Sequence, residues 1–431
     1  MKRLIPFLLL ALIGWQGAAQ ARLTIEIIGG TEGAQPIAVV PFGKAEGMPL
    51  AEDVAAIIAA NLGRTGRFKP MPRGDLIAAP SSVEQVDLND WRLLAMDNLV
   101  IGQVLPRSGG GYDVTFVLFD VFRGDQLANM TLSSSGADLR FTAHRISDII
   151  YERLTGSPGV FATRIAYVTA DRSTTAGERV ALRVADSDGY NPQTIVASRE
   201  PILSPAWSPD GRRLAYVSFE NKQAAVYVQE LTTGRRERMA AHKGINGSPA
   251  WSPDGSKLAL TLSMGGNPDI YVLDINSRAL TQITDHFAID TEPAWSPDGT
   301  HLLFTSGRGG NPQVYRVAAT GGAAERVTFE NDYNARASYA PDGRSIALVT
   351  RVNGRFRIGL LDLATRSLRL LSDGGLDETP SFAPNGSMII YATQHAGRGV
   401  LAAVSVDGSV SQRLSQDLGD VREPAWSPLV R

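Results

Sequence analysis

Short apolar runs bounded by turn residues recur through the second half of the chain. They come in pairs within each unit, such as 214–217 followed by 226–228 and 258–260 followed by 270–273, and are rich in Val, Ile, Leu and Tyr. A helix would need a longer stretch with a period near 3.6 residues, so these runs predict β-strands. A shorter, more basic third run closes each unit.

A seven-residue motif precedes each first run, and its clearest copy, Pro-Ala-Trp-Ser-Pro-Asp-Gly, spans 205–211. Further copies cover 249–255, 293–299, 337–343 and 380–386, with a truncated copy at 424–428. The aromatic position recurs at spacings of 44, 44, 44, 43 and 44 residues, at Trp207, Trp251, Trp295, Tyr339, Phe382 and Trp426. The Pro-Asp-Gly end of the motif favours a turn. Four short strands in about 44 residues predict the blade of a β-propeller.

The first and last units are incomplete in complementary ways. A strand at 165–168 has no aromatic motif before it, and its companions are expected near 180–185 and 194–197. The copy at 424–428 provides an aromatic strand with no second strand after it. We therefore predict six blades, in which the strand at 424–428 completes a blade begun near 164–198 and leaves no open edge.

Residues 22–160 lack the repeat and predict a separate α/β domain before the propeller at 161–431. Strands are expected at 23–28, 37–42, 99–105, 112–122 and 127–132, and helices at 51–62, 88–96 and 140–154. The strand at 23–28 alternates and is expected at a sheet edge. The glycine-rich segment 108–111 lies between two strands, so it predicts a hairpin turn rather than a phosphate-binding loop.

The first residues predict a signal peptide at 1–21. Lys2 and Arg3 precede an apolar stretch at 4–13 that is too short to span a bilayer, and Ala19-Gln20-Ala21 fits a cleavage site. We expect an exported protein that starts at Arg22. Removing the two basic residues leaves 40 Lys and Arg against 44 Asp and Glu, a net charge of −4. This balance argues against a general nucleic-acid or anionic-membrane binder, and the lack of cysteine excludes disulfides and thiol chemistry.

Several segments outside the repeat carry a family resemblance. They are 36–42 (Pro-Ile-Ala-Val-Val-Pro-Phe), 57–68 around Asn61-Leu62-Gly63-Arg64, 143–151 and 163–168 (Thr-Arg-Ile-Ala-Tyr-Val). With the signal peptide and the six-fold array, they resemble the TolB family, the periplasmic component of the bacterial Tol–Pal envelope system. The resemblance covers essentially the whole mature chain. It implies a non-enzymatic adaptor, peripheral to the envelope through its partners, and a monomer without cofactor.

Enzyme chemistry finds little support in the residues. A prolyl-oligopeptidase-type hydrolase needs a Gly-x-Ser-x-Gly nucleophile elbow, which the sequence lacks. The five histidines are scattered without metal-ligand spacing, and His144 is expected to be a packed or capping side chain. Asp285 and Asp290 are better interpreted as solvated loop carboxylates than as cation ligands. The alternative that remains is a secreted propeller hydrolase or lyase acting on a glycan or peptide.

Binding is expected from the residues that precede each aromatic motif. Loops that enter the aromatic strands gather at one mouth of a propeller channel, and here their residues vary while the motif stays uniform. The motif's Trp and Asp residues are expected to be scaffold, as inter-blade packing and turn formers. The resemblance implies that the mouth binds the lipoprotein Pal and can be exploited by colicins. The predicted collar consists of Asn246, Thr291, Glu292, Arg336, Glu378, Thr379, Arg422 and Glu423.

The resemblance implies a second site at the mature N-terminus. In the TolB family this mobile segment binds the C-terminal domain of TolA by adding a strand. The segment here is short, alternating and terminal, which suits strand addition. It consists of Arg22, Leu23, Thr24, Ile25, Glu26, Ile27 and Ile28.

Overall fold

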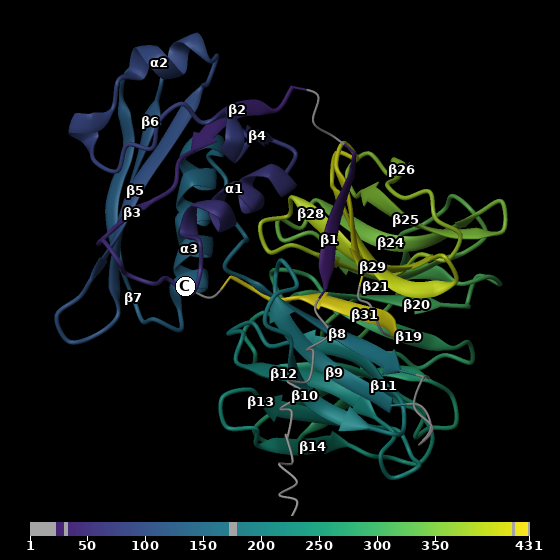
Figure 1. Ribbon diagram of the computed structural model, residues 1–431. Helices are drawn as coiled ribbons and strands as arrows, with labels where there is room; N and C mark the ends of the chain where they lie inside the picture. The colour runs from purple at the N-terminus through teal and green to yellow at the C-terminus, as the bar shows by residue number, and fades with distance from the viewer. Residues whose placement is uncertain (1–22, 30–32, 172–178, 416–418, 430–431) are drawn as a thin grey trace, which may run out of the picture.

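The computed structural model describes residues 23–29, 33–171, 179–415 and 419–429. Two bodies lie side by side, a mixed α/β layer and a ring of small sheets (Figure 1). The predicted signal peptide and Arg22 lie outside the described residues. Among the helices of the described ranges, none combines the length and apolar character needed to cross a membrane.

The α/β body is built on one sheet with the strand order β4-β2-β5-β6-β7, and β3 pairs with the far part of β5. Its strands are β2 (Gln35–Val39), β3 (Gly43–Lys44), β4 (Phe68–Pro70), β5 (Asn98–Pro106), β6 (Tyr112–Asp120) and β7 (Gln126–Ser134). Its helices are α1 (Val54–Arg64), α2 (Leu88–Leu93) and α3 (Leu139–Thr155), with 3-10 turns at Arg73–Asp75 and Val83–Gln85. Helices α1 and α3 bury one face of the sheet and α2 the other, which gives two apolar cores.

The predicted helices are present with shifted ends. The side chain of Asp53 accepts a hydrogen bond from the Ala56 N–H at 3.1 Å, so α1 begins at Val54 rather than at Ala51. The prediction of a helix over 88–96 was too long. Helix α2 ends at Leu93 because Ala95 adopts a left-handed φ of 54° and turns the chain.

Six sheets form the propeller. Blade one contains β8 (Arg164–Asp171), β9 (Arg179–Asp186), β10 (Gln193–Ser198) and β31 (Asp420–Trp426). Blade two contains β11 (Ile202–Trp207), β12 (Arg213–Ser218), β13 (Ala225–Glu230) and β14 (Arg236–Ala240). Blade three contains β15 (Asn246–Trp251), β16 (Lys257–Leu262), β17 (Asp269–Asp274) and β18 (Leu280–Gln282).

The other three blades repeat this antiparallel order. Blade four contains β19 (Asp290–Trp295), β20 (His301–Ser306), β21 (Gln313–Ala318) and β22 (Glu325–Arg326). Blade five contains β23 (Asn334–Tyr339), β24 (Ser345–Val352), β25 (Arg355–Asp362) and β26 (Leu368–Leu370). Blade six contains β27 (Glu378–Phe382), β28 (Met388–His395), β29 (Arg398–Ser405) and β30 (Ser411–Ser415).

The C-terminal strand closes the ring as predicted. Strand β31 pairs antiparallel with β8, with Trp426 opposite Ile165 and Arg422 opposite Val168. The Trp426 indole N–H donates to the Thr163 hydroxyl at 2.8 Å. Strands far apart in sequence therefore form one blade, and the ring has no open gap between its first and last blades.

The aromatic residues of the motif join neighbouring blades. The indole N–H of Trp207 donates to the carbonyl of Ala425 at 3.0 Å, and Trp251 donates to Ala206 at 3.2 Å. Trp295 makes the same contact with Ala250 at 3.1 Å. Each tryptophan thus packs and hydrogen-bonds across a blade interface, which confirms its expected scaffold role.

The strand nearest the N-terminus lies on the propeller. Strand β1 (Thr24–Gly29) pairs antiparallel with β30 and becomes a fifth strand on blade six (Figure 1). The sequence grouped it with the α/β domain, and it is instead an edge strand of the ring. Leu23 is fully buried in a cluster with Ile165 and Tyr167, and Glu26 forms an ion pair with Arg413 at 3.1 Å.

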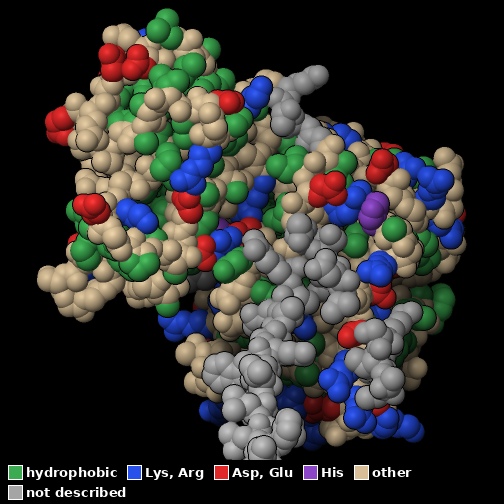
Figure 2. Space-filling view, viewed as in Figure 1, with side chains coloured by type: hydrophobic (Ala, Val, Ile, Leu, Met, Phe, Trp, Pro, Cys, Tyr) green, Lys and Arg blue, Asp and Glu red, His purple; other side chains and the backbone are tan. Residues whose placement is uncertain are grey.

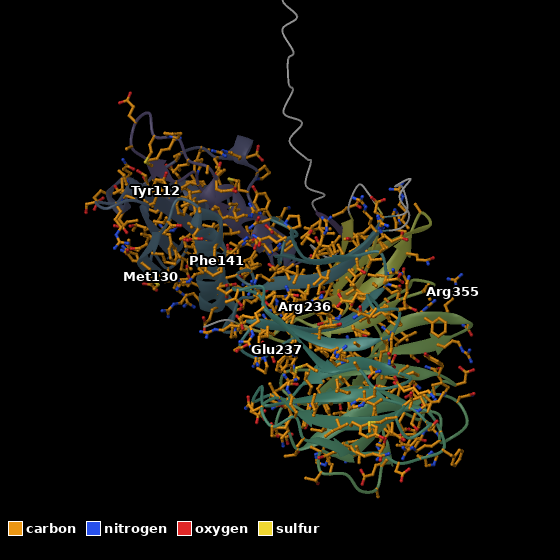
Figure 3. The ribbon with its side chains drawn as sticks, turned by 90° about the horizontal axis from the view of Figure 1, so that it is seen from below. Tyr112, Met130, Phe141, Arg236, Glu237 and Arg355 are labelled. Carbon is orange, nitrogen blue, oxygen red and sulfur yellow. The ribbon has the colours of Figure 1, made fainter. Side chains whose placement is uncertain are left out.

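The outer edge of blade two carries charge. Strand β14, marked by Arg236 and Glu237 in Figure 3, is the outermost strand of blade two. Charged side chains on an exposed edge disfavour pairing with a further strand. Blade six differs because β1 covers its edge.

Candidate functional site at the channel mouth

Six residues with an unusual backbone conformation line the propeller channel. Each directly precedes a copy of the aromatic motif and has a φ between 47° and 58°, in the left-handed region. These residues, which we call the channel ring, are Ser204, Ser248, Glu292, Arg336, Thr379 and Glu423. Residues other than glycine seldom adopt this conformation. Here it coincides with a register shift in every aromatic strand.

The bulge corrects one feature of the predicted collar. The sequence placed these residues in loops before the aromatic strands, whereas the structure places them inside those strands. In β19, for example, the register shifts between Thr291 and Ala294, on either side of Glu292. A bulge re-aims the side chain of its extra residue. All six ring residues line a channel cavity of about 460 Å³.

Arg336 connects several members of the channel ring. Its Nε donates to Glu292 at 2.8 Å, its Nη1 donates to the Thr379 hydroxyl at 2.7 Å, and the same Nη1 lies 3.6 Å from Glu423. Burial alone would lower the pKa of Arg336, but the carboxylates of Glu423, Glu292 and Glu378 outweigh it and raise that pKa. The guanidinium therefore stays charged and holds two carboxylates together.

The two ring glutamates also link one blade to the next. The Glu292 carboxylate accepts the Arg336 backbone N–H at 3.1 Å, and the Glu423 carboxylate accepts the Ser204 N–H at 3.2 Å. The second contact joins the C-terminal strand β31 of blade one to β11 of blade two. The ring charges consequently have a structural role as well as a position in the channel lining.

The remaining predicted collar residues fall outside the cavity lining. Thr291, Glu378 and Arg422 each come one residue before a ring member, so they alternate away from the channel along their strands. Glu378 is exposed, whereas Thr291 and Arg422 are half-buried. The structure thus brings together Glu292, Arg336, Thr379 and Glu423 and leaves the other three beside them.

Asn246 holds a loop rather than exposing its side chain. It is 1% exposed, its Oδ1 accepts the His242 N–H at 2.8 Å, and its Nδ2 donates to the His242 carbonyl at 2.7 Å. Asp290, Asn334 and Asp377 occupy the same blade position and are also buried. The structure thus buries this predicted collar residue, and the recurrence of Asn or Asp at this position is the signal that could have revealed the loop clamp.

The mouth lies at the end of the channel away from the α/β body. Loops that enter the aromatic strands contact the loops between the second and third strands of the blades, as when Asn267 donates to the His286 carbonyl at 2.7 Å. At the opposite end, Asn385 in the turn before β28 donates to the Pro158 carbonyl at 2.7 Å. The first domain therefore contacts the propeller at the end of the channel opposite the mouth.

Comparisons with known proteins agree with this architecture along the whole chain. Residues 151–430 match the model of the TolB beta propeller domain, and residues 23–127 match the TolB amino-terminal domain. The Tol-Pal system protein TolB of Nitrosococcus oceani is 62% identical over 423 residues, which are 97% of each chain. The chain belongs to the TolB family.

Other members of the TolB family support the same assignment. The Tol-Pal system protein TolB of Thioalkalivibrio sulfidiphilus is 62% identical and covers 100% of this chain and 99% of its own length. The crystal structure of TolB from Acinetobacter baumannii superposes with a TM-score of 0.88 at 41% identity, covering 95% of this chain and 100% of the other. The chain is thus a component of the Tol–Pal system, and this family assignment replaces the alternative of a propeller hydrolase or lyase.

The surface charge is mixed on the face shown in Figure 2. Lys and Arg side chains are interspersed there with Asp and Glu side chains. A broad field of one sign, as nucleic-acid binders use, is missing from the described part of that face.

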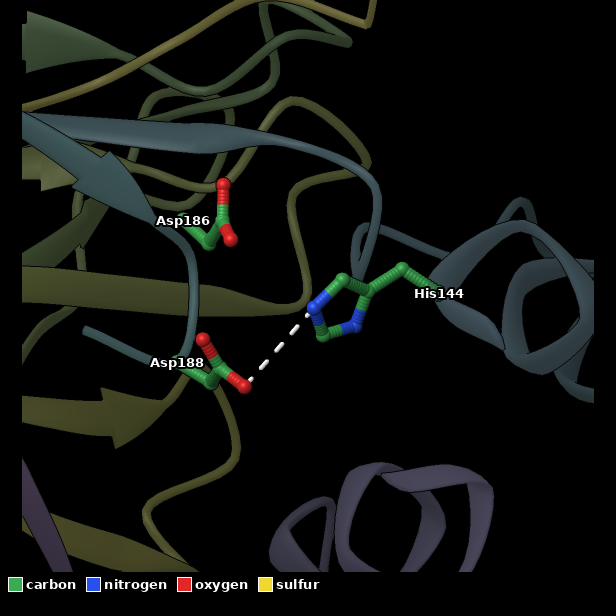
Figure 4. A group of neighbouring side chains, drawn as sticks. All are labelled: His144, Asp186 and Asp188. Atoms are coloured by element: carbon green, nitrogen blue, oxygen red, sulfur yellow. Dashed lines mark ion pairs between the residues drawn. The ribbon is translucent and has the colours of Figure 1, made fainter. Parts of the chain in front are cut away.

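A second group of charged residues lies between the two domains of this TolB-family chain. His144 on α3 is 1% exposed, and its Nε2 lies 3.7 Å from Asp188, in the turn after β9 (Figure 4). Its Nδ1 lies 2.9 Å from Asn61 Nδ2, which can only donate, so the Nε2 of the neutral ring carries the proton that faces Asp188. His144 is packed, as expected.

Arginines neutralise the carboxylates of this junction. Arg140 forms an ion pair with Asp188, lies 4.0 Å from Asp186 and stacks on the Tyr190 ring at 3.8 Å. Burial lowers the pKa of His144 to about 3 and raises that of Asp186 to about 6.

Three of these residues have the composition of a metal site that the sequence did not suggest. His144, Asp186 and Asp188 bring their ligand atoms within 4.8 Å of one another, although 42 residues separate the histidine from the first aspartate. A cation here would compete with Arg140 for Asp188 and meet the charge of nearby Arg64. The group therefore fits a domain contact better than a metal centre.

Proposed function

We propose that this TolB-family chain is a non-enzymatic periplasmic adaptor that binds the lipoprotein Pal at its channel mouth and TolA through its N-terminal segment. Linking inner-membrane TolA to outer-membrane Pal in this way supports outer-membrane invagination and integrity during cell division. The observation that supports a Pal site here is the channel ring. Equivalent positions of the repeated blades hold serine in some blades and charged residues in others. Variable residues on a uniform frame are where specificity is expected.

Charge reversal at the mouth tests the Pal site. We expect Glu292→Lys to abolish capture of purified Pal, because it places a second cation beside Arg336 and removes that residue's hydrogen-bonded carboxylate. Since this change can also disturb the ring, the exposed Glu378→Lys serves as a second variant with a smaller risk to folding. Thermal melting of each variant separates lost binding from lost structure.

A matched substitution lies elsewhere on the propeller. Glu325 is on the outer strand β22, with its side chain 70% exposed, and pairs with Arg316 at 2.9 Å. Glu325→Lys should leave the affinity for Pal unchanged. If both mouth variants are folded and bind Pal as tightly as this control, the mouth is not the Pal site.

The proposed TolA site has a free strand edge. Strand β1 is the first strand in the order of its sheet, so its outer side can accept another strand while its inner side pairs with β30. Ile27 and Ile28 are 42% and 52% exposed, which leaves apolar side chains available to a partner. Deleting 22–30 should abolish binding of the TolA C-terminal domain while the propeller remains folded; retained affinity refutes strand addition.

A crosslink distinguishes two routes of strand addition. Glu26 and Arg413 lie directly opposite in the β1–β30 pair, and the chain has no cysteine of its own. The double variant Glu26→Cys with Arg413→Cys would hold β1 on the propeller when oxidised. Binding of TolA in the oxidised form indicates addition to the docked strand, whereas binding only after reduction indicates that β1 must first leave.

A further inference from the structure

Exposed apolar side chains gather on three neighbouring loops at one side of the channel mouth. Phe287 is 87% exposed, Ile289 57%, Met264 50% and Ile245 48%. We call these four residues the apolar rim. Large apolar side chains that cluster on a surface, unlike single ones, mark sites of interaction.

Hydrogen bonds join the three loops of the apolar rim. The Ile245 N–H donates to the Ser263 hydroxyl at 2.7 Å, next to Met264. Asn267, in the same loop as Met264, donates to the carbonyls of His286 and Ala288 at 2.7 and 2.8 Å. These two carbonyls flank Phe287, so its exposed ring stands on a fixed backbone.

The loop that carries Phe287 is further braced by His286. The Nδ1 of His286 accepts the Ala288 N–H at 3.0 Å. The ring centroids of His286 and Phe287 lie 4.3 Å apart. An aromatic side chain held in place loses little conformational entropy on binding, as is typical of residues that dominate interface energies.

The apolar rim is continuous with the channel ring. Ile289 directly precedes β19, and Glu292, three residues later and within β19, lines the channel. A protein seated over the channel therefore meets both the charged ring and the apolar rim on blades three and four. The loops 241–245, 263–268 and 285–289 contain two charged residues, Lys243 and Asp285. The rim therefore has no basic cluster to attract an anionic bilayer.

We infer that the apolar rim forms one side of the protein-binding surface at the mouth and is covered by an apolar patch on the protein seated there. The inference rests on the proposed function, in which that protein is Pal. It adds an off-centre contact: the partner buries Phe287 and Ile289 in addition to reaching the ring. A large aromatic side chain that a partner buries often carries much of the affinity of a contact.

Calorimetry with purified Pal tests the inference. Phe287→Ser should weaken binding about tenfold, and the double variant with Ile289→Ser should weaken it further. The heat-capacity change of binding should become less negative, because less apolar surface is buried. Leu93→Ser is the matched control, since Leu93 is 86% exposed on α2 of the other domain. Affinity within twofold of wild type in the double variant overturns the inference.

The outcomes separate this inference from the proposed function. If Glu378→Lys weakens Pal binding and the rim variants do not, the rim inference fails while the Pal site stands. If neither set weakens it, both fail. Two other results would assign the rim to another occupant and also overturn the inference. One is a dimer of the wild-type chain that Phe287→Ser abolishes. The other is sedimentation of the wild-type chain with neutral or anionic lipid vesicles that the same substitution abolishes.

Discussion

The two ends of the propeller place charged groups in opposite surroundings. At the domain junction, Arg140 is only 14% exposed and packs between Asp188 and the Tyr190 ring. At the mouth, Arg336 is 36% exposed and faces an open channel. The first arrangement is closed by its own partners and fixes one domain against the other. The second leaves room for a further molecule, and for that reason we propose the mouth as the binding surface.

Backbone geometry differs between the ends as well. The mouth places Glu292, Arg336 and Glu423 at left-handed positions inside strands, where a bulge directs each side chain into the channel. The junction charges come from helices α1 and α3 and from the turn after β9, without such a bulge at His144 or Arg140. Left-handed residues that recur inside the aromatic strands at the mouth are consistent with a functional constraint there.

Removing the closing strand should have the largest effect, because both ends depend on it. Deleting 424–431 removes the Trp426 contact with Thr163 and the backbone pairing of Ser427 with Arg164 at 2.8 Å. It also leaves Glu423 as the last residue of a shortened β31, in which only Asp420 to Arg422 still pair with β8. We expect a loss of more than about 5 kcal/mol in the free energy of unfolding, from lost aromatic burial and an open blade.

Thermal unfolding followed by circular dichroism measures this loss. The milder Trp426→Phe variant keeps most of the packing but loses the indole N–H, so its Tm should lie between those of wild type and the truncation. An unchanged Tm in the truncated chain would show that ring closure contributes nothing.

The repeat made the ring predictable, because the period and the incomplete end units follow directly from the positions of Trp207 to Trp426. Local sequence could not assign β1 to a sheet, since 23–28 alternates as any edge strand does. Only the tertiary pairing with β30 decides between the two domains. The number of blades follows from counting the copies of the motif. Which strand pairs with the edge of a blade depends on residues far apart in the sequence.

The candidate site was predictable in position but not in detail. The residues before each motif do mark the mouth, yet sequence gave no sign that Glu292 and Arg336 adopt a left-handed backbone. The burial of Asn246 was not predicted, because a buried loop clamp and an exposed binding residue have the same polarity. The junction was missed altogether, since His144 and Asp188 meet only when two domains pack.

Acid should weaken the junction through His144. Between pH 6.5 and about 3 the imidazole binds a proton in the unfolded chain but not in the fold, because burial lowers its folded pKa to about 3. Its contribution is therefore complete above pH 6.5 and falls as the pH decreases. The difference in stability between wild type and His144→Gln should change by about 1.4 kcal/mol for each pH unit in this window.

Urea unfolding at several pH values from 7 to 4.5 gives that difference directly. The wild type should lose its advantage over His144→Gln as the pH falls. His395→Gln, at an exposed strand end, controls for loss of an imidazole. Parallel pH profiles for wild type and His144→Gln would contradict a role for the buried ring in acid sensitivity.

The smallest expected effect tests the strained backbone of the mouth. Ser248 has a φ of 47°, a conformation that glycine adopts without steric cost, so Ser248→Gly should be neutral or stabilise the fold by up to about 1 kcal/mol. Ala250, two residues later in β15, is the matched control, and Ala250→Gly should destabilise by about 1 kcal/mol because glycine there adds unfolded-state entropy and removes a methyl group packed on the neighbouring core. The urea midpoints of the two variants should therefore move in different directions or by clearly different amounts. Equal losses would mean that Ser248 stores no backbone strain, and the difference between the mouth and the junction would then rest on side chains alone.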